Sequence, residues 1–122
     1  MEWQNYKPDE LIFQEGDESN AAYLIISGNV RIVKGYDTSK SKELAVVGAG
    51  EYVGEMGAID NLPRSASAVA QGNVVCTPVT PAEFMDMLRK NPDEAIDLLK
   101  ILFERLRAAN RRLAEIEQAG AD

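Results

Sequence analysis

Glycine-containing turns divide the first eighty residues into short apolar segments, and this spacing restricts the folds open to the chain. The turn signals recur at intervals of roughly 8 to 12 residues, which is typical of a compact antiparallel barrel or roll. A break is expected at Gly28 and Asn29, and a hairpin turn at residues 71–73. The predicted strands cover residues 11–13, 21–27, 30–34, 44–47, 65–70 and 74–79.

The hydrophobic period changes after residue 80. Thr80, Pro81 and Glu83 form a capping box, with an N-cap threonine, proline at the first helical position and glutamate three residues after the cap. This predicts a short helix to about Lys90, and the same pattern at Asn91 predicts a long helix to about residue 118, with Gly120 as a stop. We therefore expect a mainly β fold with C-terminal helices, as one domain over residues 1–122, with a β-roll at 7–80 and helices at 81–118.

The long predicted helix carries a heptad stripe of apolar residues. Spacings that alternate between four and three residues are typical of a coiled-coil seam. Two interpretations remain open: the whole stripe covers the core of its own domain, or part of it pairs two copies in a homodimer. The stripe comprises Ala95, Leu99, Leu102, Leu106, Ala109, Leu113 and Ile116, and the predicted dimer contacts are Leu99, Leu102, Leu106, Ala109 and Leu113.

The absence of histidine and the acidic balance narrow the possible functions. With no histidine among 122 residues, Ser-His triads, Cys-His nucleophiles and imidazole zinc sites are excluded, so we expect a protein that is not an enzyme. A net charge of -7 argues against DNA binding by this chain itself. The lone Cys76, expected to be a buried packing residue, and the lack of a signal segment or a membrane-length apolar run predict a cytoplasmic protein.

The chemistry concentrates in the glycine-rich stretch at residues 47–70. A helical turn starting near Glu55 would present free N–H groups to an anion, and Arg64 can supply a fork of donors to a phosphate. A carboxylate at Glu55 would repel that phosphate unless it faces a hydroxyl group of the same ligand, as acidic residues face ribose in dinucleotide sites. Phosphate donors beside a carboxylate predict a nucleotide site without a metal, although Arg64 and Glu55 could also form a plain ion pair.

These residues resemble a known family. Gly54-Glu55 followed by Pro63-Arg64-Ser65-Ala66 is similar to the phosphate-binding cassette of cyclic nucleotide-binding domains, found in the catabolite activator protein, protein kinase A regulatory subunits and cyclic-nucleotide-gated channels. The segments at 11–17 and 23–30 resemble the first strands of that family. The resemblance covers residues 7–113 and implies a jelly-roll-like β-roll with a short cassette helix, the cassette at residues 50–66, and a C-terminal hinge and lid.

The resemblance also implies roles for individual residues. Arg64 would pair with the cyclic phosphate, Glu55 would accept from the ribose 2′-hydroxyl, and the lid would close over the base. Val53 and Gly57 depart from the family pattern, and Gly57 should loosen the backbone. The implied ligand-binding set is Gly54, Glu55, Gly57, Ala58, Arg64, Ser65, Ala66 and Asn110, the last of these against adenine.

Three functions follow from these patterns as alternatives. The first is a sensor of cyclic AMP (cAMP), favoured over cyclic GMP (cGMP), that needs no cofactor and converts binding into movement of its C-terminal helix. The second is a roll without ligand that serves as a dimerisation or docking module. The third is the sensor fragment of a DNA-binding transcription regulator or of a channel.

Overall fold

The computed structural model describes the backbone of residues 2–120 and the side chains of residues 2–118. The chain divides into two compact units, Met1–Met85 and Asp86–Asp122. The predicted single domain over residues 1–122 stays a prediction, and its end residues 1, 121 and 122 lie outside the described part.

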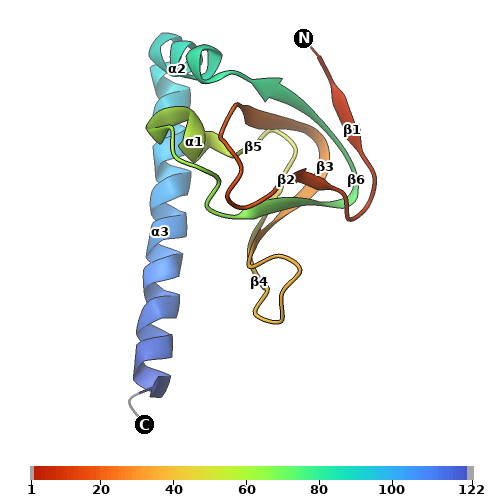
Figure 1. The fold of residues 1–122 in the computed structure, drawn as a ribbon. Coiled ribbons are helices and arrows are strands. Elements are labelled where there is room, and N and C mark those ends of the chain that lie inside the picture. The colour runs from red at the N-terminus through yellow and green to blue at the C-terminus, as the bar shows by residue number, and fades with distance from the viewer. Residues whose placement is uncertain (1, 121–122) are drawn as a thin grey trace. The chain divides into compact units, whose positions relative to one another are not determined.

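The described strands form one antiparallel sheet in the first unit, which is the predicted β-roll (Figure 1). The sheet has the order β1-β6-β3-β4, while β2 also pairs with β6 and β5 also pairs with β3. The two long strands at its centre pair with each other over most of their length, because their apolar residues face the same interior. The strands are β1 (Gln4–Tyr6), β2 (Leu11–Phe13), β3 (Ala22–Lys34), β4 (Lys42–Gly48), β5 (Tyr52–Val53) and β6 (Ser67–Val79).

The core lies inside the roll and consists mainly of small aliphatic side chains. Burial of this surface is the main favourable term in folding. Cys76 is fully buried on β6, as predicted, and burial raises the pKa of its thiol to about 11. The core cluster comprises Ile12, Ile25, Val30, Val47, Val53, Ala68, Ala70 and Val74.

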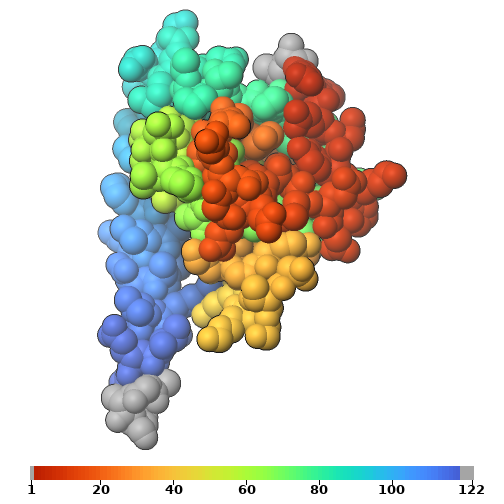
Figure 2. Space-filling view, in the orientation of Figure 1, coloured from red at the N-terminus to blue at the C-terminus, as the bar shows by residue number. Residues whose placement is uncertain are grey.

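Two predicted turns are wrong, for one shared reason. Residues 28–29 and 71–73 do not end strands but lie inside β3 and β6, where the pairing register shifts. Gly28 has φ +91°, and a Cβ there would collide with the Asn73 carbonyl oxygen. A positive-φ glycine suits a β-bulge as well as a hairpin turn, so the two long strands bend where a hairpin was expected. Residues 35–41 connect β3 and β4, and this loop projects from the surface of this unit in Figure 2.

The helices begin where the capping signals indicate. In α2 (Pro81–Lys90), the Glu83 N–H donates to Thr80 Oγ1 at 3.1 Å and the Thr80 N–H donates to the Glu83 carboxylate at 3.2 Å, which confirms the capping box. The long helix α3 (Pro92–Gly120) follows directly, and the Asn91 side-chain amide donates to the Met87 carbonyl at 3.0 Å. No helix among residues 2–120 is both long and apolar enough to cross a membrane.

Much of the apolar stripe on α3 is exposed. Leu99, Leu106 and Leu113 are each about half exposed. Large apolar side chains in such a row are characteristic of an interaction surface. Pairing of two copies through this stripe stays a prediction. Ile96, Phe103 and Ile116 are exposed to a similar extent.

Candidate functional site

Arg64 lies in the connection between α1 (Glu55–Asp60) and β6, and only 6% of it is exposed. Its Nη1 donates to the Gly54 carbonyl oxygen at 2.8 Å, and its Nη2 donates to the Ala21 carbonyl oxygen. Its Nε is buried and has no hydrogen-bond partner among the described residues. Leaving a buried donor unsatisfied costs about 1–3 kcal/mol, and more for a charged group. The guanidinium is therefore held in place while its Nε–H is still to be satisfied.

Two aromatic rings form the surroundings of the Arg64 guanidinium. Its Cζ lies 4.1 Å from the centroid of the Phe13 ring and 5.9 Å from that of Tyr23, and the two rings stack with their centroids 6.1 Å apart. Burial lowers the pKa of Arg64, while Tyr23, Asp17 and Glu55 oppose the decrease. Arginine stays protonated in proteins, so the site keeps a buried positive charge.

Gly54 and Glu55 begin the cassette helix, as predicted. Gly54 has φ +76°, and a Cβ there would collide with Arg64 Nη1 and lie 3.0 Å from Phe13 Cε2. Glycine at this position thus permits both the left-handed backbone and the close approach of the guanidinium. Glu55 follows in the first turn of α1 and is only 4% exposed. A buried carboxylate and a buried guanidinium therefore flank Gly54.

Gly57 is buried in α1 because a side chain from a distant segment takes up the space beside it. A Cβ at position 57 would collide with the Cβ and Oγ of Ser19. The Ser19 hydroxyl in turn donates to the Leu62 carbonyl oxygen at 2.6 Å, just after the helix. The sequence predicted only that Gly57 loosens the backbone, whereas the structure shows that a glycine at this position also leaves space for the Ser19 side chain. Ala58 is also buried, at 7% exposure.

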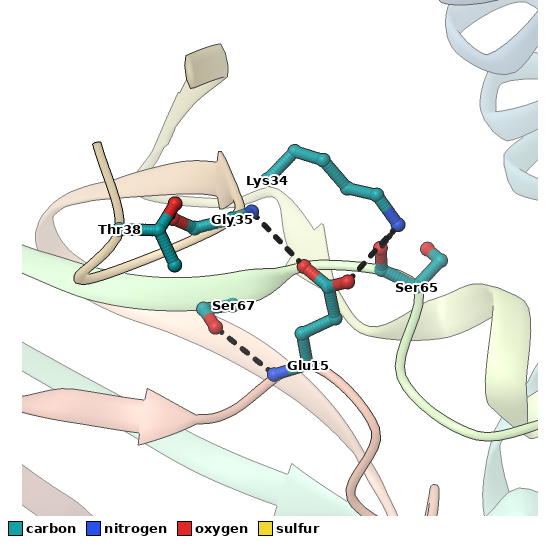
Figure 3. Close-up of polar contacts among 6 residues, drawn as sticks. All are labelled: Glu15, Lys34, Gly35, Thr38, Ser65 and Ser67. Atoms are coloured by element: carbon teal, nitrogen blue, oxygen red, sulfur yellow. Dashed lines mark hydrogen bonds and ion pairs between the residues drawn. The ribbon is translucent and has the colours of Figure 1, made fainter. Parts of the chain in front are cut away.

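Backbone hydrogen bonds hold the segment after α1 against the turn at residues 14–17. The Arg64 N–H donates to the Asp17 carbonyl at 2.8 Å, and the Gly16 N–H donates to the Arg64 carbonyl at 2.8 Å. Lys34 Nζ donates to the Ser65 carbonyl at 2.9 Å (Figure 3). The Ser65 side chain is exposed, while Ala66 is buried. The backbone on both sides of the Arg64–Ser65 peptide is therefore fixed.

The predicted site residues of the first unit lie in α1, at its N-cap residue Gly54 and in the connection after the helix. Asn110 is different: it is exposed on α3, in the second unit, and its role stays a prediction. Within residues 2–120, no group of three or more cysteine and acidic side chains could hold a metal ion.

Several residues that shape the site were not identified from the sequence. Phe13 and Tyr23 lie in predicted strands, but strand alternation alone does not say that their rings contact Arg64. The Ala21 carbonyl and Ser19 carry no recognisable signal, since each meets a partner that lies 43 residues away in the chain. Only the folded register brings these groups together.

Comparison with known proteins shows a family match over most of the chain. The family model for the cyclic nucleotide-binding domain matches residues 3–91. The cyclic AMP receptor protein of Thermus thermophilus is 35% identical over 108 residues, covering 88% of this chain and 50% of that protein. The chain thus spans about half the length of this curated relative.

Solved structures give the same result for the fold. The catabolite activator protein of Thermus thermophilus superposes with a TM-score of 0.81 at 33% identity, covering 95% of this chain and 55% of the other. The EAL enzyme Bd1971 in its cAMP-bound form superposes with a TM-score of 0.68 at 34% identity, covering 93% of this chain and 30% of the other. The same enzyme in its cGMP-bound form gives a TM-score of 0.66 at 34% identity, with coverages of 87% and 28%.

Proposed function

The chain belongs to the cyclic nucleotide-binding domain family, and from this premise we propose that it binds cyclic AMP in the site around Arg64. The observation that carries the proposal is the buried Arg64 guanidinium, whose Nε has no hydrogen-bond partner in the described part of the chain. A cyclic phosphate supplies anionic oxygens to such a donor, and charge-assisted hydrogen bonds of this kind are about twice as strong as neutral ones. The local positive charge is what can hold an anion in a chain of net charge -7.

The other cassette residues take roles that fit their positions. Glu55 accepts a hydrogen bond from the ribose 2′-hydroxyl, because its buried carboxylate lies at the start of the same helix. The backbone N–H groups near Gly57, Ala58, Ser65 and Ala66 complete the phosphate cradle, and the left-handed Gly54 keeps the chain clear of Arg64. In this scheme Asn110 contacts the adenine base.

The preference for cyclic AMP over cyclic GMP rests on two considerations. The sequence relative with 35% identity is a cyclic AMP receptor protein. The exposed Ser65 hydroxyl directly follows Arg64 and suits cyclic AMP, although it can also reach a guanine amine. The cAMP-bound and cGMP-bound forms of Bd1971 are the reason that both nucleotides have to be tested.

The proposed output is mechanical rather than catalytic. Binding shifts the population of C-terminal helix positions, and the exposed α3 stripe pairs two copies through Leu99, Leu102, Leu106, Ala109 and Leu113. Because the chain spans about half of its curated relative, this sensor can also be part of a longer regulator. We also propose a cytoplasmic location, because the one cysteine, Cys76, is a free thiol and disulfides are rare in the cytoplasm.

Calorimetry with cyclic AMP, cyclic GMP and linear AMP tests the proposal on the purified chain. We expect saturable binding of cyclic AMP, weaker binding of cyclic GMP, and a loss of affinity of about tenfold or more in Arg64→Lys, which keeps the charge but loses the planar fork. Arg31→Lys is the matched control, because Arg31 carries the same charge in the same unit and pairs with the exposed Asp9 at 3.4 Å. Light scattering alongside gives the oligomeric state.

Two results would contradict the proposal. A folded wild-type chain that gives no heat with either cyclic nucleotide at high micromolar concentration refutes nucleotide binding. Equal affinity in wild type and Arg64→Lys, with both proteins folded by circular dichroism, refutes the assignment of the site.

A further inference from the structure

A group of polar contacts links Ser65, the residue after Arg64, to the C-terminal end of β3. Lys34 Nζ donates to the Ser65 carbonyl oxygen at 2.9 Å and pairs with the Glu15 carboxylate at 3.1 Å. The same carboxylate accepts a hydrogen bond from the Gly35 N–H at 3.1 Å. The Glu15 N–H donates to the hydroxyl of the fully buried Ser67 at 2.9 Å. Figure 3 shows the Lys34 ammonium close to the Glu15 carboxylate and to Ser65, and the Glu15 backbone N–H close to Ser67.

The contact with the Ser65 carbonyl has a consequence for the next residue. In a trans peptide the C=O and the following N–H point in opposite directions within one plane. No cis peptide bond occurs in the described chain. When Lys34 holds the Ser65 carbonyl, it therefore directs the Ala66 N–H away from Lys34. The Ala66 N–H is one of the donors assigned to the phosphate cradle.

We propose that Lys34 and Glu15 are positioning residues for the anion site: Lys34 fixes the orientation of the Ser65–Ala66 peptide, and Glu15 holds Lys34 in place. This inference rests on the proposed function, since it concerns the same cradle. Glu15 makes three of these contacts: its carboxylate contacts both Lys34 and Gly35, and its N–H donates to Ser67. Glu15 is therefore held at its backbone N–H and at its carboxylate, and this carboxylate in turn pairs with the Lys34 ammonium.

The exposure of the pair indicates that its main effect is on geometry rather than on global stability. The Lys34 side chain is 55% exposed and that of Glu15 is 34% exposed. Exposed ion pairs contribute little to folding. A small displacement of a hydrogen-bond donor, in contrast, weakens ligand binding directly, because hydrogen bonds depend steeply on distance and angle.

The test measures cyclic AMP affinity by calorimetry in Lys34→Met, Lys34→Arg, Glu15→Gln and the control Lys42→Met. Lys42 is the cross-strand partner of Lys34, so the control removes the same charge from the same hairpin. We expect Lys34→Met to lose about fivefold in affinity, Lys34→Arg to retain most of it, and Lys42→Met to remain within about twofold of wild type. The Ala66 amide resonance in nitrogen-edited NMR spectra of the free protein should shift in Lys34→Met and not in Lys42→Met.

Glu15→Gln separates positioning from simple charge. If Lys34 acts only as a distant positive charge, removal of a neighbouring negative charge must strengthen anion binding. If Glu15 holds Lys34 in place, the same change must weaken it, and we expect weakening of about threefold. Unfolding midpoints measured on the same proteins show whether affinity changes independently of stability.

The outcomes are distinguishable from failure of the proposed function. If the wild-type chain does not bind cyclic AMP, both the function and this inference are overturned. If wild type binds and Lys34→Met binds equally well, or Glu15→Gln binds more tightly, the inference alone is overturned. Equal losses in Lys34→Met and Lys42→Met also overturn it, because charge would then explain both.

Discussion

The packing of Ser19 against Gly57 predicts a reversal in the sign of one substitution. In the wild-type chain, Gly57→Ala places a methyl group where the Ser19 Cβ and Oγ already lie. Overpacking of this kind costs about 1–3 kcal/mol, while alanine in place of glycine within a helix gains about 0.5–1 kcal/mol. We therefore expect Gly57→Ala to destabilise the wild-type protein by about 1–2 kcal/mol.

The residue at position 19 decides whether Gly57→Ala stabilises or destabilises the protein. In Ser19→Gly the Cβ is gone, so Gly57→Ala should become stabilising by about 0.5–1 kcal/mol. In Ser19→Ala the Cβ remains, so Gly57→Ala should still destabilise the protein. Both changes at position 19 remove the hydrogen bond from Ser19 to the Leu62 carbonyl, so that bond contributes equally to the two backgrounds.

The assay is urea-induced unfolding of all six proteins followed by circular dichroism, analysed as a double-mutant cycle. A coupling energy of about 1–3 kcal/mol is expected between Gly57→Ala and Ser19→Gly, and little coupling with Ser19→Ala. If Gly57→Ala has the same effect in all three backgrounds, to within about 0.5 kcal/mol, the steric argument is refuted.

Three further predictions concern single side chains. Thr80→Ala removes the cap on α2 and should lower the free energy of unfolding by about 0.5–2 kcal/mol. Thr80→Ser keeps the hydroxyl and should retain most of the wild-type stability, so equal losses for the two variants in urea unfolding would count against the capping box. Because burial raises the pKa of Cys76 to about 11, the native chain at pH 8 should react with a thiol reagent far more slowly than the urea-unfolded chain, and equal rates would contradict burial. The hydrogen bond from the Gly35 N–H lowers the pKa of the Glu15 carboxyl, and Lys34 adds a smaller effect in the same direction. The ionised Glu15 therefore stabilises the folded chain above its pKa in the unfolded chain, about 4.3, and this stabilisation is lost as the pH falls from that value through the lower pKa of the folded chain. Glu15→Gln should therefore flatten the acid dependence of the unfolding midpoint between about pH 5 and pH 3, and an unchanged slope would oppose this assignment.

Local signals in the chain were sufficient for much of the fold. The capping box at Thr80 joins groups three residues apart, and both of its predicted hydrogen bonds form. The start of α1 at Glu55 was likewise predicted from adjacent residues, and the apolar segments gave the approximate positions of most strands. Interactions over a few residues can be recognised in this way because the intervening backbone has few conformations.

The predicted turns show where local signals are ambiguous. The positive φ of Gly28 serves a bulge in β3 rather than the end of a strand, and residues 71–73 bend β6 rather than form a hairpin. Glycine permits both structures at similar cost. The pairing register of two strands that lie far apart in sequence makes the choice.

By itself, the sequence determined the class of fold, the start of each helix and the candidacy of Glu55 and Arg64, since these depend on hydrophobic period, capping residues and charge type. Only the tertiary structure decided that Arg64 is buried against Phe13, that Ser19 fills the space beside Gly57 and that Lys34 holds Ser65. Each of these contacts joins segments more than thirty residues apart. Such pairs become neighbours only when the whole sheet has formed, because its register is set by the combined burial of many side chains and by no single local signal.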